Sequence, residues 1–202
     1  KGELLVSTTG SMDSDFVTLA HKHIDKLSWD NLFHNSWAEG LTYIFEICDV
    51  SDPHIVEEAE GAYLIGARKL KGGSMALEVQ LDDIAEFLGA ERPAWGQMPF
   101  AQAKLLSECV DHEGFMIRDA ETGSTIMKIK SPHYLTKKAL MRVGARQIEV
   151  MFDNPDFFRE RLDEEFYGVF EVIISHGKDF WQRLEEHERR TFLEKFFTQE
   201  VV

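Results

Sequence analysis

One stretch of the sequence, residues 113–134, predicts a β-hairpin that constrains what the rest of the chain can form. Residues 113–118 are rich in apolar side chains, as expected of a strand, and residues 119–124 supply the Asp, Thr, Gly and Ser of a turn. The second arm carries Lys128 and Lys130. Side chains two residues apart on a strand point to the same face, so the two ammonium groups should emerge side by side. A rigid pair of cations suits an anion such as a phosphate group.

The charge around this hairpin is opposite to the charge of the whole chain. The sequence has 36 acidic residues against 22 lysines and arginines, which gives a net charge of −14. Between Glu121 and Glu149 there is no acidic residue, and the interval contains Lys128, Lys130, Lys137, Lys138, Arg142 and Arg146. A basic stretch within an acidic chain is the electrostatic footprint of a phosphate-binding site. The alternative is a solvated ribbon with ordinary surface lysines.

Composition excludes several other classes of protein. A chain of 202 residues that is 44% hydrophobic can bury one good core or a domain with a small appendage. Its acidity argues against broad, nonspecific coating of nucleic acid but allows a local basic groove. No apolar run approaches the ~20 residues of a membrane span, and residues 1–10 contain no signal-peptide core, so we expect a cytoplasmic protein. Cys48 and Cys109 lie in apolar surroundings without metal-binding spacing, which predicts two buried free thiols.

The predicted elements change in character at about residue 134. Before it, a β-branched and aromatic run at residues 41–48 predicts a strand, and residues 62–70 and 74–79 predict a hairpin around a Lys-Gly-Gly turn. After it, only helical periodicity remains, with glycines as breaks. We therefore predict an α+β part over residues 1–134 and an all-helical C-terminal domain over residues 135–202.

The N-terminal part contributes a strand over residues 2–6 and a helix over residues 13–27 to this prediction. Three histidines lie in or near that helix: His21, His23 and His34. No acid or cysteine completes a metal-binding set with them in the sequence, so we expect them at surface or capping positions.

Glu46 is the unusual residue of the strand at residues 41–48, because apolar side chains flank it. A polar group buried without a hydrogen bond costs roughly 2–7 kcal/mol. Glu46 should therefore either face solvent or serve a function, and the sequence leaves both interpretations open.

In their order and spacing these residues resemble the covalent nucleotidyltransferases, which are the ATP-dependent ligases and capping enzymes. The residues that carry the resemblance are Phe45-Glu46, Arg68, Glu113-Gly114-Phe115, Lys128-Ile129-Lys130-Ser131 and Tyr134. The pattern is most similar to that of the phage-type RNA ligases of the T-even class. The resemblance spans residues 1 to about 134 and implies an antiparallel-sheet nucleotidyltransferase core (an ATP-grasp-like ligase core) that lacks its N-terminal part, followed by a helical domain.

This resemblance implies an ATP-dependent RNA ligase that uses ATP and Mg²⁺ in RNA repair, phage-encoded and acting in the host cytoplasm. A lysine attacks the α-phosphate of ATP and is adenylylated, AMP passes to a 5′-phosphate RNA end, and a 3′-hydroxyl displaces AMP and seals the strand. RNA ends, with tRNA among them, are the implied partners.

The resemblance also assigns roles to individual residues. Lys128 and Lys130 would neutralise the α-phosphate, and Glu113 would place the divalent ion or the nucleophile. Glu46 would accept hydrogen bonds from the ribose hydroxyls, a function that accounts for a carboxylate inside the strand. Further contacts to the nucleotide are expected from Phe45, Arg68 and Tyr134, and contacts to the RNA from Lys137, Lys138, Arg142 and Arg146.

Two features depart from the family pattern. The family's nucleophile lies in a Lys-x-x-Gly motif, whereas Lys1 is followed by Gly-Glu-Leu. Alignment of the strand at residues 2–6 places the nucleophile about a dozen residues before Lys1, so we expect an upstream segment to carry it and the chain alone not to form lysyl-AMP. Thr9 stands where the phage-type ligases tend to carry a basic residue.

Two alternatives remain open. Within the superfamily, the chain could be a DNA ligase or a capping guanylyltransferase. From another class, it could be a non-catalytic acidic α+β interaction module whose hairpin lysines are surface charges.

Overall fold

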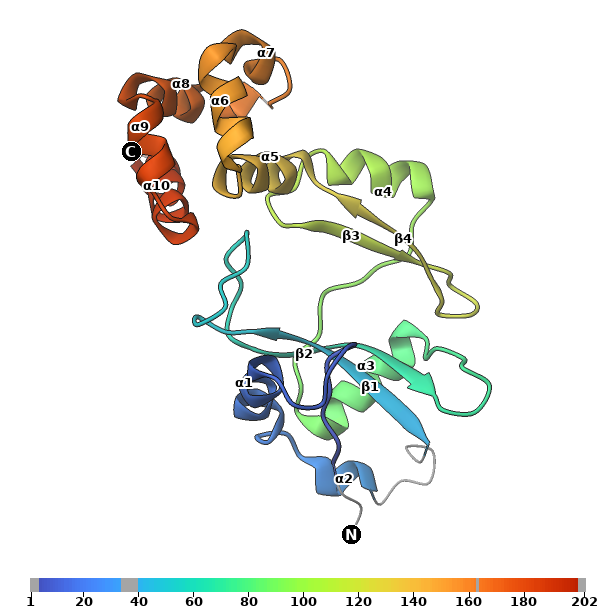
Figure 1. Cartoon of the computed structure of the whole chain (residues 1–202). Helices are drawn as coiled ribbons and strands as arrows, with labels where there is room; N and C mark the ends of the chain where they lie inside the picture. Colours follow the sequence, from blue (N-terminus) through green and yellow to red (C-terminus); the bar gives the residue numbers. More distant parts are fainter. Residues whose placement is uncertain (1–3, 34–39, 163, 200–202) are drawn as a thin grey trace. The chain divides into compact units, whose positions relative to one another are not determined.

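The computed structural model describes residues 4–33, 40–162 and 164–199 (Figure 1). It is a mixed α+β structure with two small antiparallel sheets, which confirms the predicted class. Its internal contacts define two compact units: unit 1 comprises Lys1–Pro99 and Met116–Met127, and unit 2 comprises Phe100–Phe115 and Lys128–Val202. The predicted boundary at residue 134 stays a prediction, and the two units are described separately below.

The sheet of unit 1 consists of β1 (Leu41–Cys48) and β2 (Gly61–Lys69). They pair antiparallel, with Cys48 opposite Gly61, and a β-bulge follows Ile44. Exposure along β1 alternates from residue to residue, as expected of a strand with one covered face. The predicted strand at residues 41–48 is therefore confirmed, but it is half-buried and not enclosed on both faces.

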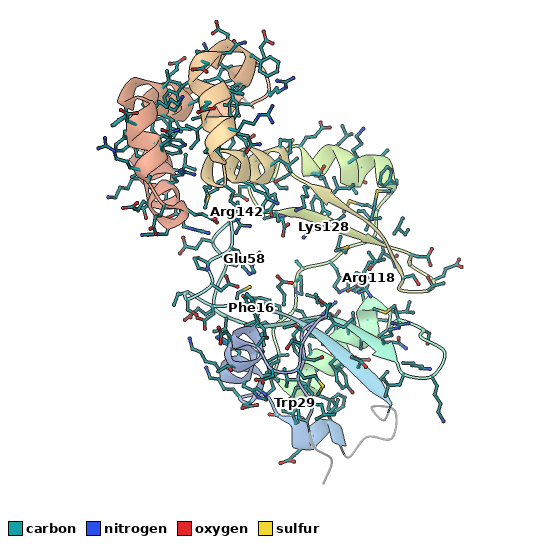
Figure 2. All side chains as sticks on the ribbon, in the orientation of Figure 1. Phe16, Trp29, Glu58, Arg118, Lys128 and Arg142 are labelled. Atoms are coloured by element: carbon teal, nitrogen blue, oxygen red, sulfur yellow. The ribbon has the colours of Figure 1, made fainter. Side chains whose placement is uncertain are left out.

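Three helices accompany this sheet: α1 (Asp15–Ile24), α2 (Trp29–Phe33) and α3 (Glu78–Leu88). Helices α1 and α3 pack against it, and α2 packs against α3 (Figure 1). The buried side chains they share with β2 are Ala20, Ile24, Leu32, Ala62, Leu64, Ala67, Leu81, Ile84, Ala85 and Leu88. Trp29, marked in Figure 2, sits edge-on to Tyr43 and Phe45 with ring centroids 5.9 and 6.2 Å away. The inward side chains of β1 therefore complete the core of unit 1.

Two predicted strands of unit 1 do not form. Residues 4–6, the described part of the first, make no strand ladder, and Leu4 and Val6 pack instead against the core beside Ala62. The second arm at residues 74–79 is reduced to a single bridge between Arg68 and Met75. Helix α3 begins at Glu78, inside the predicted arm. The Gln80 side chain caps the start of this helix by accepting a hydrogen bond from the Leu77 N–H at 2.9 Å.

The hairpin predicted within residues 113–134 is present as β3 (Gly114–Arg118) and β4 (Thr125–Lys130). Asp119 closes its turn by accepting hydrogen bonds from the Thr122 hydroxyl and N–H, both at 2.8 Å. Within unit 1, Arg118 is anchored by a 2.6 Å ion pair with Glu78, which also pairs with Arg92. Arg118 and Arg92 are only 11% and 12% exposed. This buried network fixes the tip of the hairpin.

Unit 2 begins with α4 (Phe100–Ser107), and after β4 it is helical, as predicted. Its further helices are α5 (Pro132–Met141), α6 (Ala145–Asp153), α7 (Pro155–Arg159), the 3₁₀ turn η2 (Glu164–Phe166), α8 (Tyr167–His176), α9 (Lys178–Arg183) and α10 (Glu186–Gln199). Phe166, Phe170 and Trp181 are fully buried, as expected of core aromatic residues.

A buried arginine connects the helices of unit 2. Arg189 on α10 is 9% exposed and donates hydrogen bonds to the carbonyls of Met141, Val143 and Trp181. It therefore ties the end of α5 to α9 and α10. No helix in the described part of the chain is long and apolar enough to cross a membrane.

Candidate functional site

The two hairpin lysines meet on one carboxylate in unit 2. Glu113 Oε1 lies 2.9 Å from Lys128 Nζ and 3.2 Å from Lys130 Nζ. The three side chains are 33–41% exposed, so they form a half-buried cluster open to solvent. Both lysines therefore lie on one face of β4 (Lys128 is marked in Figure 2), as their spacing predicts.

Tyr134 extends this cluster from the first turn of α5. Lys130 Nζ lies 4.5 Å above the centroid of the Tyr134 ring and 3.4 Å from its hydroxyl, and Lys138 Nζ lies 5.9 Å from the same centroid. The local sequence explains the position of the ring. Ser131 caps α5 by accepting a hydrogen bond from the Tyr134 N–H at 3.1 Å, and Pro132 fits the first helical position.

The same serine joins the helix to the hairpin. Its Oγ donates to the His112 carbonyl at 2.6 Å, and its N–H donates to the Glu113 carbonyl at 3.0 Å. The start of α5 and the residue before β3 are therefore held in one arrangement, and this arrangement places Tyr134 beside Lys130.

Gly114 allows the hairpin to close beside Glu113. Its backbone has φ +129°, in a region that side-chain-bearing residues rarely adopt, and a Cβ atom would lie 2.0 Å from the Ile129 carbonyl oxygen. The glycine at the start of β3 is thus required by the close approach of β4.

The electrostatics of the cluster favour a charged carboxylate. Partial burial opposes the charge of Glu113, but the hydrogen bonds and charges of Lys128 and Lys130 outweigh it and lower the pKa of Glu113. Burial likewise opposes the charge of Lys130, and its bonds to Glu113 and Tyr134 raise the pKa of that ammonium group overall. Two cations facing one anion leave a net positive charge that an added phosphate could neutralise.

The remaining residues expected around the nucleotide lie in unit 1. The Glu46 side chain is 54% exposed, so it faces solvent, and its function in nucleotide binding stays a prediction. Phe45 packs inward against Trp29. Arg68 is exposed and donates from Nε to the Gly73 carbonyl at 3.3 Å. That these residues join the lysine cluster around one nucleotide stays a prediction.

The four residues expected to contact RNA differ in whether an acidic residue of the chain already pairs with them. Lys137 is 8% exposed, with Nζ 3.9 Å from Glu194, and Arg142 pairs with Glu186 at 2.6 Å. Lys138 lies over Tyr134. Arg146 lines an open pocket of about 230 Å³ together with Gln147, Val150, Phe157, Phe158 and Arg161. Lys138 and Arg146 are therefore better placed than the other two to contact a partner.

The structure also contains a buried carboxylate that the sequence did not reveal. Asp49, which follows β1, is 5% exposed, and its Oδ2 lies 2.5 Å from Lys22 Nζ and 2.6 Å from His23 Nε2. The expectation of a surface or capping position is wrong for His23, which is 7% exposed. The hydrogen bond from Lys22, followed by those from Ser51 and His23, holds the pKa of Asp49 well below its usual range.

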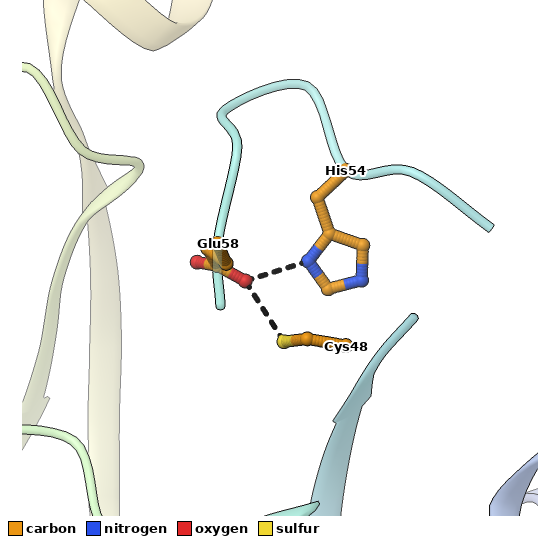
Figure 3. A group of neighbouring side chains, drawn as sticks. All are labelled: Cys48, His54 and Glu58. Atoms are coloured by element: carbon orange, nitrogen blue, oxygen red, sulfur yellow. Dashed lines mark hydrogen bonds and ion pairs between the residues drawn. The ribbon is translucent and has the colours of Figure 1, made fainter. Parts of the chain in front are cut away.

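Beside Asp49, three potential metal ligands converge (Figure 3). Glu58 Oε2 lies 3.1 Å from Cys48 Sγ and 2.8 Å from His54 Nδ1. Burial, followed by the nearby Glu58, raises the pKa of the Cys48 thiol to about 12. The prediction of a buried free thiol is confirmed for Cys48 and wrong for Cys109, which is exposed.

Comparison with known protein-family models finds no match for this chain, and comparison with curated proteins finds no relative.

Proposed function

We propose that this chain belongs to an ATP-dependent RNA ligase of the covalent nucleotidyltransferase type, and that Lys128 and Lys130 bind the α-phosphate of ATP. The observation that carries the proposal is the convergence of the two ammonium groups on Glu113 at 2.9 and 3.2 Å. A strand holds these cations at a fixed separation, and a half-buried position limits the competition from water.

Each lysine would form a charge-assisted hydrogen bond to the phosphate. Such bonds are worth about 1.5–3 kcal/mol each, because the charge strengthens the bond while the site excludes part of the solvent. The same contacts strengthen as negative charge accumulates on the phosphate oxygens during nucleotidyl transfer, so they favour the transition state over bound ATP.

The other assignments follow from the family pattern and are part of the same proposal. Glu113 would shift from its lysine partners toward Mg²⁺ when nucleotide binds. Glu46 would accept from the ribose hydroxyls, with Phe45, Arg68 and Tyr134 as neighbours of the nucleotide. Lys138 and Arg146 would contact the RNA, since Lys138 lies beside Tyr134 and Arg146 lines an open pocket.

In the reaction, the nucleophilic lysine forms an N–P bond to the α-phosphorus, and the bond to the β-phosphate breaks with release of pyrophosphate. The 5′-phosphate of RNA then displaces the lysine, and the 3′-hydroxyl displaces AMP. The 202-residue chain is tested for nucleotide binding, the step that the lysine pair is proposed to serve.

The binding test is a calorimetric titration of the chain with ATP and Mg²⁺. Lys128→Ala and Lys130→Ala should each weaken binding by about 10-fold to 100-fold, the loss of one charge-assisted bond. Lys178→Ala is the matched control, since Lys178 is in the same unit, 35% exposed, and 3.9 Å from Glu149. Unchanged affinity in both hairpin variants, or equal loss in the control, would show that the lysine pair is not a phosphate site.

The same titration separates the alternatives. Preference for GTP over ATP would favour a capping guanylyltransferase, and preference for nicked DNA over RNA ends as a second ligand would favour a DNA ligase. Absence of nucleotide binding at any concentration tested would favour the interaction module.

A further inference from the structure

We propose that Cys48, His54 and Glu58 form a binding site for a thiophilic divalent cation such as Zn²⁺, separate from the Mg²⁺ of the proposed reaction. The three ligand atoms lie within 4.8 Å of one another, and all three residues belong to unit 1 (Figure 3). The inference does not rest on the proposed function.

The distances fit a metal centre after a small expansion. Zn–S bonds of about 2.3 Å and Zn–N or Zn–O bonds of about 2.05 Å place tetrahedral ligands about 3.6 Å apart for S with O or N, and about 3.4 Å apart for N with O. The corresponding separations here are 3.1 Å for Cys48 Sγ to Glu58 Oε2 and 2.8 Å for His54 Nδ1 to the same oxygen. These two pairs, which share the Glu58 oxygen, have to open by about half an ångström to admit the ion, a movement within reach of a side-chain adjustment.

The backbone around the site is well held. Cys48 ends β1 and pairs with Gly61 at the start of β2, so the two ends of the loop that carries His54 and Glu58 are joined by the sheet. Within that loop Ile55 is 3% exposed, and Asp49 bridges to Asp52. Cations are bound more tightly by ligands on such a fixed frame, because less conformational entropy is lost on binding.

The site combines a buried ligand with an open side. Cys48 is 4% exposed, whereas the side chains of His54 and Glu58 are 29% and 40% exposed. An ion could enter between the two exposed ligands and reach the sulfur, and a water molecule could complete a fourth position. Three protein ligands with one open position are typical of zinc sites that retain an exchangeable ligand.

Glu46 provides the outer partner that metal-bound histidines usually have. Its Oε1 lies 3.9 Å from His54 Nε2, the ring nitrogen that faces away from Glu58. When Nδ1 binds the ion, Nε2 carries a proton and can donate a hydrogen bond to Glu46 once the two side chains move closer, which would fix the ring orientation. This contact gives the exposed carboxylate of β1 a role that needs no nucleotide.

The chemistry of the ligands selects the class of ion. The thiol releases its proton to solvent when the S–metal bond forms, and thiolate and carboxylate together then balance the two charges of the cation. Sulfur and imidazole ligands favour Zn²⁺, whereas Mg²⁺ prefers an octahedron of oxygens and should not compete. Without a metal the same trio is a hydrogen-bonded group in which Glu58 accepts from Cys48 and His54.

The test is a titration of the chelator-treated chain with Zn²⁺ by calorimetry and with Co²⁺ by absorption spectroscopy. We expect one ion per chain, a thiolate-to-cobalt charge-transfer band, and no displacement by excess Mg²⁺. Cys48→Ser should abolish the band, and His54→Gln and Glu58→Gln should weaken Zn²⁺ binding at least 10-fold. Cys109→Ser, at the exposed cysteine of unit 2, should leave the band and the affinity unchanged.

Three further outcomes complete the test. Since Cys48 is buried and its replacement could unfold unit 1, the partly exposed His54 and Glu58 variants carry the decision, with circular dichroism to confirm that they fold. Wild-type affinity in both of these variants, absence of Zn²⁺ binding by the folded chain, or loss of the cobalt band in Cys109→Ser would overturn the proposal.

Discussion

Replacing Gly114 by alanine should open the base of the β3–β4 hairpin. The new Cβ would lie 2.0 Å from the Ile129 carbonyl oxygen and 2.9 Å from Lys130 Cα, and both are backbone atoms that cannot rotate away. To restore normal van der Waals distances, β3 and β4 would have to separate by more than roughly 1 Å, which is enough to disrupt their hydrogen bonds. The change therefore acts on the segment that places Glu113 against the two lysines.

The expected loss of stability has two parts. An alanine at φ +129° is strained by about 1–3 kcal/mol, and overpacking against a fixed backbone adds about 1–3 kcal/mol. The sum is about 2–6 kcal/mol, a large share of the 5–15 kcal/mol that stabilises a typical domain. Because the clash is local, the hydrogen exchange of the hairpin amides should increase even where the rest of unit 2 stays folded.

Gly177→Ala is the control that separates strain from steric clash. Gly177 is in the same unit and has φ +87°, but a Cβ there would meet nothing within 4 Å. Urea denaturation followed by circular dichroism should therefore show only the strain part of the loss for this variant, about 1–3 kcal/mol. If Gly114→Ala is no more destabilising than Gly177→Ala, the close approach of β4 to Gly114 is not a constraint and the reasoning fails.

Three further predictions test other parts of the structure. Asp49→Asn should make the free energy of unfolding depend less on pH in acid. Folding lowers the pKa of Asp49, so this carboxylate stabilises the wild-type protein above its unfolded pKa of about 3.9, and the stabilisation is lost as the pH falls toward the folded pKa. Denaturation of both proteins at a series of acidic pH values measures the difference. Arg189→Met should destabilise unit 2 by about 1–3 kcal/mol for each buried carbonyl left without a donor, whereas Arg183→Met, outside that network, should change the free energy of unfolding by less than about 0.5 kcal/mol. Tyr134→Phe keeps the ring beneath Lys130 and removes only the 3.4 Å hydroxyl contact, so its effect on stability should stay below about 1 kcal/mol.

The parts of the fold that the sequence predicts correctly depend on local patterns. The strand at residues 41–48 has the right bounds because β-branched and aromatic residues fill it. The lysine pair on β4 follows from the two-residue period of a strand alone. None of these features requires knowledge of a distant partner.

The parts that it misses depend on partners far along the chain. Asp49 lies 26 residues from His23 and 27 from Lys22, so no spacing in the sequence could reveal their contact. The trio around Cys48 forms because the β1–β2 pairing brings Glu58 back over the end of β1. The arm at residues 74–79 has strand composition, but hydrogen bonds at the start of α3 and the ion pairs of Glu78 favour the helix. Tertiary contacts override local propensity in each case.

The two roles available to Glu113 lead to opposite expectations for Glu113→Gln. As a counter-ion, Glu113 competes with phosphate for the ammonium groups of Lys128 and Lys130. Its neutralisation should therefore strengthen the binding of inorganic triphosphate without Mg²⁺, by about 1.5-fold to fivefold for each partly exposed charge contact that is removed. As a metal ligand, it attracts Mg²⁺, and the same substitution should weaken binding of ATP with Mg²⁺. A nucleotidyl-transfer site gives both stronger binding of triphosphate without Mg²⁺ and weaker binding of ATP with Mg²⁺. A surface ion pair gives only the first result, because its carboxylate does not bind Mg²⁺. Stronger binding of both ligands in calorimetry would leave Glu113 as a counter-ion and remove it from the proposed chemistry, because a carboxylate that helps neither Mg²⁺ nor ATP has no part in nucleotidyl transfer.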